Sequence, residues 1–244
     1  MSLKFGLVGK NIDYSFSRGY FSKKFENEGL DHSYENFDLL NINEFESVLK
    51  EKHLRGLNVT IPYKEAIIPY LDSLNKKACK IGAVNTIKIT KKGKLKGYNT
   101  DYYGFKKSLE PLLKSYHDTA LILGTGGASK AIKQVFKKLG IVTHFVSRTA
   151  GKDIAFTYDT LTDHIIEEHN IIVNCTPLGT YPNIEAYPNI PYQGITSQHL
   201  VYDLIYNPEV TTFLKKAKME GAVIQNGLRM LQLQAEKSWE IWRS

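Results

Sequence analysis

The chain has 244 residues, of which 42% are hydrophobic and 23% are charged, so its composition excludes a disordered or collagen-like protein. Only two cysteines are present, Cys79 and Cys175, which excludes a disulfide scaffold and a cysteine-rich zinc module. The first residues lead directly into a strand-like pattern without a signal-peptide signature, and no apolar run reaches the roughly 18 residues that a membrane span requires. We therefore expect a cytoplasmic protein with no membrane partner.

The net charge of +7 arises from 32 Lys and Arg residues against 25 Asp and Glu residues. Basic proteins attract nucleic acids, but here the lysines are scattered and do not alternate with aromatic residues along one strand. The seven histidines show no spacing typical of a metal site. We therefore expect no nucleic-acid partner and no metal, and a positive field that suits a small phosphorylated or carboxylated ligand.

Short apolar strands alternate with amphipathic helices along the first hundred residues. In chain order the pattern predicts strand Leu3–Gly9, helix Ser17–Leu30, strand Tyr34–Leu39, helix Asn43–Lys52 capped by Asn43, strand Gly56–Thr60, short helices Lys64–Leu71 and Leu74–Lys80, and a hairpin of Ala83–Thr90 and Lys94–Thr100.

The second half continues the alternation more regularly. It predicts helix Asp101–Lys114, strand Thr119–Leu123, helix Gly127–Leu139, strand Thr143–Ser147, helix Leu161–His169, strands Ile171–Asn174 and Leu200–Leu204, helix Thr211–Gly221, strand Ala222–Gln225 and helix Leu228–Trp242. Such alternation favours an α/β fold of two domains with parallel sheets and helices on both faces, joined near Asp101.

A glycine-rich turn follows the apolar strand Thr119–Leu123 and opens the next helix. Gly124, Gly126 and Gly127 allow a tight turn whose backbone N–H groups approach a pyrophosphate, while Ser129 stands at the usual third glycine position. The next strand ends not in an acid but in Ser147 and Arg148, followed by Thr149 and Lys152. A guanidinium with a nearby ammonium suits a 2′-phosphate, so the sequence predicts NADP rather than NAD.

Three polar clusters precede this dinucleotide-binding pattern. In Gly56-Leu-Asn-Val-Thr-Ile-Pro-Tyr-Lys64, a strand leads to a lysine at the start of a predicted helix. A cation is disfavoured at the positive end of a helix dipole, so this position is poor for stability and suitable for a general acid or base. Gly82-Ala-Val-Asn-Thr86 and Gly97-Tyr-Asn-Thr-Asp101 flank the hairpin, and we expect Asn85 and Asp101 to converge at its outer ends.

These motifs together resemble those of the shikimate/quinate dehydrogenase family. The similarity includes Asn58–Lys64, Gly82–Thr86, Asn99–Asp101, Gly124–Ala128 and Ser147–Thr149, and later Asn174–Gly179, Tyr202–Pro208 and Gly227–Ala235. The resemblance implies a substrate domain of residues 1–101 completed by the helix 227–244, and a Rossmann-type, doubly wound NADP-binding domain of residues 102–226. It further implies reversible, NADP-dependent reduction of 3-dehydroshikimate to shikimate in chorismate and aromatic amino acid biosynthesis, by a monomer or homodimer.

The resemblance also implies a role for each matching residue. Lys64 and Asp101 are the expected catalytic pair at the reacting C3 oxygen of the substrate. The expected substrate ligands are Ser15, Ser17, Thr60, Asn85, Tyr206 and Gln234. The expected cofactor ligands are Gly124, Thr125, Gly126, Gly127, Ala128, Ser147, Arg148, Thr149, Lys152, Leu204, Gly227 and Met230.

The first serine motif departs from the family pattern, because Tyr14 replaces the usual His and Arg18 the usual Pro. This departure leaves open a family member acting on a related polyol carboxylate. A quinate/shikimate dehydrogenase that prefers NAD is another alternative, against which Arg148 and Lys152 argue. A protein that binds NADP or a nucleic acid without catalysis is a further alternative, which the presence of both Lys64 and Asp101 disfavours.

Overall fold

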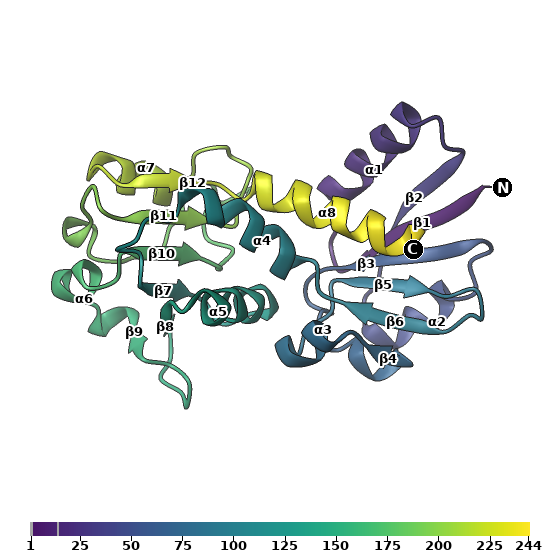
Figure 1. Ribbon diagram of the computed structural model, residues 1–244, viewed down its shortest axis with the longest axis horizontal. Coiled ribbons are helices and arrows are strands. Elements are labelled where there is room, and N and C mark those ends of the chain that lie inside the picture. The colour runs from purple at the N-terminus through teal and green to yellow at the C-terminus, as the bar shows by residue number, and fades with distance from the viewer. Residues whose placement is uncertain (1, 14) are drawn as a thin grey trace. The chain divides into compact units, whose positions relative to one another are not determined.

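The computed structural model describes residues 2–13 and 15–244. The chain divides into two compact units, one of Met1–Thr100 with Ala235–Ser244 and one of Asp101–Gln234 (Figure 1). The predicted domain boundaries placed Asp101 and all of residues 227–244 in the first domain. In the structure the division falls before Asp101 and again inside the terminal helix.

The first unit is built on a six-stranded mixed sheet in the order β2-β1-β3-β5-β6-β4. Strands β2, β1 and β3 run parallel, β5 and β6 form an antiparallel hairpin next to β3, and β4 pairs in parallel with β6. The strands are β1 (Leu3–Gly9), β2 (His32–Asp38), β3 (Leu54–Val59), β4 (Ser73–Leu74), β5 (Thr86–Ile89) and β6 (Leu95–Tyr98).

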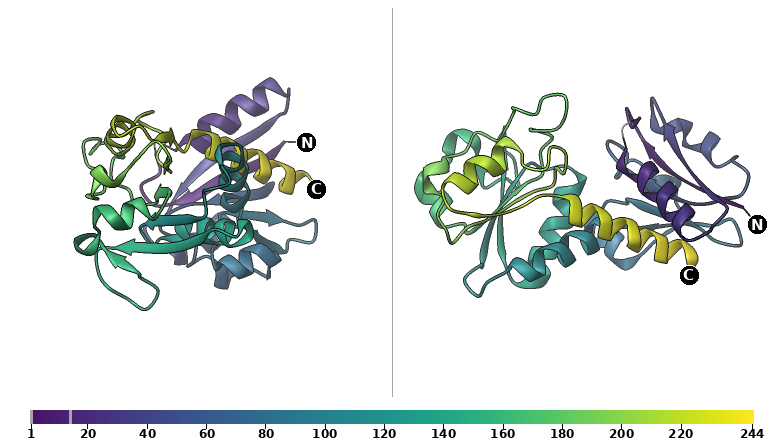
Figure 2. Two further views of the ribbon diagram at one scale, coloured as in Figure 1. Left: turned by 60° about the vertical axis from the view of Figure 1, so that its left-hand side comes forward. Right: turned by 90° about the horizontal axis from the view of Figure 1, so that it is seen from above.

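Side chains alternate between the two faces of the sheet along each strand. Because both faces carry apolar side chains, helices cover both of them. One face carries α1 (Phe16–Asn27) and the end of α8 (Leu228–Arg243) (Figure 2). Phe5 and Leu7 of β1 pack against these two helices. On the other face, Val8 packs with the cluster that contains α2 (Phe45–Val48) and α3 (Lys76–Ile81). Gly56 admits the ring of Trp242, since a Cβ there would lie 2.3 Å from the indole.

The second unit has a six-stranded, fully parallel sheet in the order β12-β11-β10-β7-β8-β9. Its strands are β7 (Thr119–Leu123), β8 (Val142–Ser147), β9 (Phe156–Thr157), β10 (Ile171–Asn174), β11 (Leu200–Asp203) and β12 (Val223–Gln225). The chain starts in the middle at β7, adds β8 and β9 on one side, and then crosses back to β10, β11 and β12. This is the doubly wound dinucleotide-binding order, so the predicted α/β fold class is confirmed.

The helices of this unit are α4 (Asp101–Leu109), α5 (Gly127–Leu139), α6 (Asp163–Glu167), α7 (Thr212–Met219) and the start of α8. The central strands β7 and β10 are almost wholly buried, as expected for a parallel sheet covered by helices. No helix in the described part of the chain is long and apolar enough to cross a membrane.

Two helix predictions in the first unit are wrong. In place of a helix over 43–52, a short 3₁₀ turn at Ile42–Glu44 leads into α2, and its cap is Asn41 rather than Asn43. In place of a helix over 64–71, successive turns end in a 3₁₀ turn at Ile68–Tyr70, where Pro69 has no N–H to continue an α-helix. The predicted helix 74–80 is present as α3, which begins two residues later after its cap Asn75, while Leu74 belongs to β4.

Candidate active site

The three polar motifs of the first unit are joined by backbone hydrogen bonds. Val59 N–H donates to the carbonyl of Asn85 at 2.9 Å, and Val84 N–H donates to the carbonyl of Lys64 at 2.7 Å. Asn85 N–H in turn donates to Tyr98 at 3.1 Å. The segment ending in Lys64, the segment around Asn85 and the segment leading to Thr100 therefore meet at one edge of the sheet.

The side chain of Asn85 is fixed in one orientation by Thr100. Its Oδ1 accepts the backbone N–H of Thr100 at 2.6 Å, and its Nδ2 donates to Thr100 Oγ1 at 3.0 Å. Both residues are buried. Because Thr100 immediately precedes Asp101 in the chain, the same contact holds the backbone from which Asp101 extends.

A buried network of hydroxyl and amide side chains supports this edge of the sheet. Ser238 of α8 lies within hydrogen-bond distance of Asn58, Thr86 and Thr100, at 3.0, 2.8 and 3.2 Å. All four side chains are less than 5% exposed. Since each group has partners inside the network, the cluster satisfies its polar atoms without water and rigidly joins α8 to the strands that carry Asn85.

The serine loop is connected to the same network. Ser15 caps α1, and its Oγ accepts the N–H of Ser17 at 3.1 Å. The hydroxyl of Tyr34 donates to Asn58 Oδ1 at 2.8 Å; burial raises the pKa of Tyr34, and a hydrogen bond with Ser17 opposes the rise. Arg18 is exposed on α1, while Tyr14 lies outside the described residues.

Thr60 and Lys64 follow β3 with their side chains partly exposed. Thr60 N–H donates to Val8 at 2.9 Å, and its methyl group occupies the space over Gly9, where a Cβ would lie 2.5 Å away. The expected helix dipole at Lys64 is absent, because the following residues form turns rather than an α-helix. Any role of Lys64 in proton transfer must therefore come from its neighbours and not from a helix terminus.

In the second unit, Asp101 and Gln234 lie on two helices that touch each other. Both side chains are buried, Asp101 at the start of α4 and Gln234 in α8. The helices meet at Gly104, where a Cβ would lie 2.5 Å from the carbonyl of Met230 and 3.0 Å from Gln234 Cβ. Asp101 precedes Gly104 by one helical turn, so this contact sets the position of both polar side chains.

The segment after β11 brings together two residues expected at the nicotinamide. A Cβ on Gly227 would lie only 2.0 Å from the carbonyl of Leu204, so the two backbones are in direct contact. Beneath them Asp203 is fully buried and accepts hydrogen bonds from Thr211 at 2.6 Å and from Ile205 N–H and Asn174 Nδ2 at 3.0 Å each. Burial nevertheless raises the pKa of Asp203 to about 6. Tyr206 follows two residues after Leu204 and is partly exposed.

The glycine-rich turn occupies the switch point of the parallel sheet, between β7 and β10. Gly124 has φ of +97°, a conformation that glycine adopts without strain, and a Cβ on it would lie 3.0 Å from Thr176. Gly126 is exposed, and a Cβ there would meet nothing within 4 Å. Ser129 is buried and donates back to the carbonyl of Gly126 at 2.6 Å, which explains why a small hydroxyl residue fits the usual glycine position.

The basic turn after β8 lies at the same edge of the sheet as the glycine-rich turn, since Gly124 N–H donates to Val146 at 2.9 Å. Ser147 is partly exposed, and Arg148, Thr149 and Lys152 are exposed. Thr125, Gly127 and Ala128 complete the turn on the side of α5. Open space over glycine backbone, a helix N-terminus and two exposed cations together suit a phosphorylated nucleotide.

Several supporting residues were not singled out from the sequence. Ser238 and Gly104 have partners distant in the chain, and Asp203 bonds to Asn174 on the neighbouring strand as well as to nearby Ile205 and Thr211. The only local signal that could have pointed to one of them is the glycine inside the helical pattern Asp101-Tyr-Tyr-Gly104. No cluster of three or more His, Cys, Asp or Glu side chains suited to a metal ion occurs among the residues that the structure describes.

A sequence profile of the shikimate dehydrogenase substrate binding domain matches residues 7–87. A shikimate dehydrogenase (NADP(+)) from Methanosphaera stadtmanae is 37% identical over 97% of this chain and 90% of its own length. Another from Staphylococcus epidermidis is 37% identical over 98% of this chain and 92% of its own length. The chain belongs to the shikimate dehydrogenase family.

Solved structures of shikimate dehydrogenases agree with this assignment. The enzyme from Aquifex aeolicus has a TM-score of 0.87 and 35% identity, over 99% of this chain and 92% of its own. The enzyme from Thermus thermophilus, in complex with NADP(H) and shikimate, has a TM-score of 0.87 and 31% identity, over 98% of this chain and 93% of its own.

Proposed function

We propose that the chain is an NADP-dependent dehydrogenase that interconverts 3-dehydroshikimate and shikimate. The observation that carries the proposal is the meeting of the segments of Lys64, Asn85 and Thr100 in one unit of a chain whose other unit has the dinucleotide-binding strand order. The relative from Methanosphaera stadtmanae is a shikimate dehydrogenase (NADP(+)), and the structure of the enzyme from Thermus thermophilus is a complex with NADP(H) and shikimate.

The proposal assigns the cofactor to the second unit. The pyrophosphate would lie over Gly124, Gly126 and Gly127, where backbone N–H groups and the start of α5 supply donors. Arg148, with Thr149 and Lys152, would hold the 2′-phosphate, since no carboxylate ends β8. The nicotinamide ring would contact Leu204, Gly227 and Met230.

The proposal assigns the substrate carboxylate to the serine loop, where Ser15 and Ser17 present two hydroxyls at the start of α1. Thr60, Asn85, Tyr206 and Gln234 would bind the carboxylate and the ring hydroxyls. Asn85 Oδ1 is already engaged by Thr100 N–H, so this side chain would act on the substrate as a donor through Nδ2.

When bound, NADPH supplies the hydride for reduction of the C3 carbonyl. Negative charge then grows on the C3 oxygen, and the ammonium of Lys64 would stabilise that charge and donate the proton. Asp101 would accept a hydrogen bond from the neighbouring hydroxyl and fix the ring. In the reverse direction Lys64 would remove the proton from the C3 hydroxyl.

The test is a steady-state assay of NADPH formation with shikimate and NADP⁺, comparing Lys64→Ala with Lys80→Ala, an exposed lysine of α3 outside the proposed site. Loss of a general acid and base should lower kcat about 10²- to 10⁴-fold in Lys64→Ala and leave KM for shikimate nearly unchanged. A Lys64→Ala enzyme with near-normal kcat would refute the role of Lys64.

The same assay with quinate and with NAD⁺ distinguishes the alternatives. Turnover of quinate that equals or exceeds that of shikimate would indicate a member with broader polyol carboxylate specificity. Absence of turnover with every pair of substrate and cofactor would overturn the enzymatic proposal itself.

A further inference from the structure

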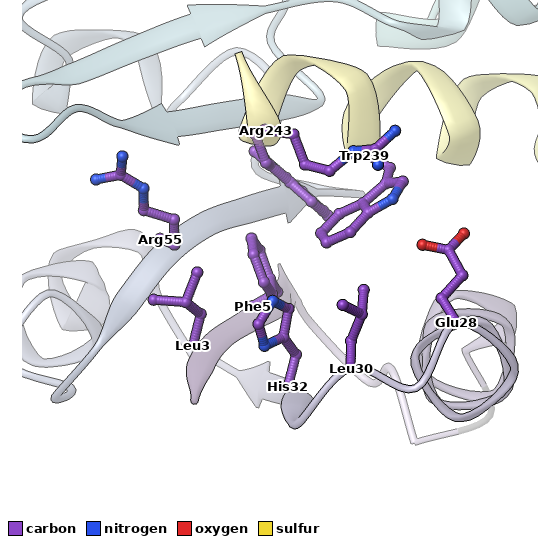
Figure 3. A pocket seen from close by; sticks show the side chains of 9 residues that line it. Leu3, Phe5, Glu28, Leu30, His32, Arg55, Trp239 and Arg243 are labelled. Carbon is purple, nitrogen blue, oxygen red and sulfur yellow. The ribbon is translucent and has the colours of Figure 1, made fainter. Parts of the chain in front are cut away.

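A cavity of about 400 Å³ lies in the first unit (Figure 3). It is formed by the first residues of β1 and β2, the segment after α1, the start of β3 and the last turns of α8. None of the residues assigned above to substrate or cofactor lines it. Its volume falls in the range of small-molecule sites, about 300 to 1,000 Å³.

The walls of the cavity are aromatic. Phe5 stacks on Trp242 with ring centroids 4.9 Å apart and meets Trp239 edge-to-face at 5.5 Å. His32 faces Trp239 from the opposite wall at 6.1 Å (Figure 3). Phe5, Trp239 and Trp242 are at most 2% exposed, so they form a rigid base, and the apolar surface open to an occupant comes from the partly exposed Leu3, Leu30 and His32.

Two polar atoms of these walls are buried without a hydrogen-bond partner among the described residues, Nε1 of Trp239 and Nδ1 of His32. Trp239 is only 2% exposed, and its indole N–H is directed at the carboxylate of Glu28, whose pKa it helps to lower. Buried polar atoms in native proteins are normally paired. The partly exposed His32 thus contributes to this wall a ring whose Nδ1 has no partner among the described residues.

The charges at the two ends of the cavity differ. At one end Glu28 is neutralised by Lys24, whose Nζ lies 2.7 Å from Oε1, and Arg243 stacks over Trp239 at 5.1 Å. At the other end Arg55 forms no ion pair within the described residues. Lys88 lies near Arg55: burial lowers the pKa of Lys88, and Arg55, Lys96 and Lys91 lower it further. Lys88 donates to Ser244, so within the described residues the positive charge without an ion pair at this end is that of Arg55.

We propose that this cavity binds a small carboxylate that carries an aromatic or similarly flat apolar group. The carboxylate lies at Arg55, whose planar guanidinium matches it with two parallel hydrogen bonds. The ring lies against Leu3, Leu30 and His32, above the buried aromatic rings. The site is independent of the proposed dehydrogenase activity, because it uses neither its substrate ligands nor its cofactor ligands.

The full-length protein contains its own reporter for this test. Its only two tryptophans, Trp239 and Trp242, both line the cavity, so tryptophan fluorescence reports on this site. We would titrate the protein with phenylacetate, with its neutral analogue phenylacetamide and with acetate. Phenylacetate should change the fluorescence saturably, and phenylacetamide should bind at least fivefold more weakly. Acetate should not saturate over the same range.

Arg55→Gln should weaken phenylacetate binding about five- to tenfold, because it removes a charge-assisted but partly exposed contact, and should leave phenylacetamide binding unchanged. Arg55→Lys keeps the charge without the planar fork and should lose less affinity. Arg229→Gln, an exposed arginine of α8 in the other unit, serves as the charge-matched control.

Thermal unfolding of each variant excludes misfolding as the cause, and Arg55→Lys supplies the comparison if Arg55→Gln does not fold. Absence of a saturable signal with phenylacetate in the unmodified protein would overturn the proposal. So would equal affinities for phenylacetate and phenylacetamide, or an Arg55→Gln variant that binds phenylacetate normally.

Discussion

Replacing Asp203 with asparagine should change how the unfolding free energy of the protein depends on pH. The Asp203 carboxyl group is fully buried at the end of β11, and burial raises its pKa from 3.8 to about 6 in spite of the hydrogen bonds from Thr211, Ile205 and Asn174. The folded protein therefore holds this proton more tightly than the unfolded chain does. The resulting stabilisation is fully present below about pH 3.8 and is lost as the pH rises through about 6.

The magnitude follows from the size of the shift. About two pKa units correspond to about 3 kcal/mol of unfolding free energy, since one unit is worth about 1.4 kcal/mol. An asparagine stays neutral at every pH. The unmodified protein should thus lose about 3 kcal/mol relative to Asp203→Asn between pH 3 and pH 7. The change in hydrogen bonding at Thr211 adds only an offset that is independent of pH.

Urea unfolding followed by far-ultraviolet circular dichroism, at several pH values across this window, measures the difference. Circular dichroism is preferable to tryptophan fluorescence here, because both tryptophans lie in the other unit. Asp159→Asn, at an exposed carboxylate of the same unit, is the control and should show no comparable trend. A constant difference between Asp203→Asn and the unmodified protein over the whole range would refute the argument.

Arg148→Ala should raise KM for NADP⁺ about 10- to 100-fold and KM for NAD⁺ far less, because a charge-assisted phosphate contact is worth about 1.5 to 3 kcal/mol. Equal increases in KM for the two cofactors would contradict this prediction. Ser238→Ala should lower the unfolding free energy by about 1 to 3 kcal/mol and raise KM for shikimate, whereas Ser108→Ala, at a buried serine bonded to Tyr202, should affect stability alone. Gly104→Ala should destabilise the protein by about 1 to 3 kcal/mol, because its Cβ would overlap Met230, and an unchanged melting temperature would argue against the close helix contact.

Sequence patterns predicted best the elements whose limits are set by local residues. The strand Thr119–Leu123 and the helix Gly127–Leu139 were predicted with their observed bounds. The apolar run of the strand ends before Gly124, and the amphipathic pattern of the helix begins at Gly127 and ends before Gly140. The helix predicted over Lys64–Leu71 failed because its apolar spacing also fits a series of turns, and Pro69 favours the turns. The two-residue strand Phe156–Thr157 is too short to produce any pattern.

The sequence predicted only those parts of the candidate site whose residues belong to short continuous motifs. Asn58 and Asn85 could be identified within their own segments, but Ser238 lies 180 residues beyond Asn58, and nothing in the sequence shows that the two bond. The role of Gly104 likewise depends on the approach of α8. Supporting contacts of this kind depend on tertiary packing, and local sequence patterns do not contain that information.

The division of α8 between the two units affects the order in which the chain folds during synthesis. All of Asp101–Gln234 leaves the ribosome before Ala235–Ser244, so the second unit can fold while the first still lacks its last helical turns. Until those turns arrive, Phe5 and Phe25 have no indole to pack against, and Asn58 lacks one of its buried partners. The N-terminal sheet is thus synthesised first, but its core is completed only when the last helical turns are present. A nascent chain stalled before Trp239 would expose an incomplete aromatic core to chaperones and proteases.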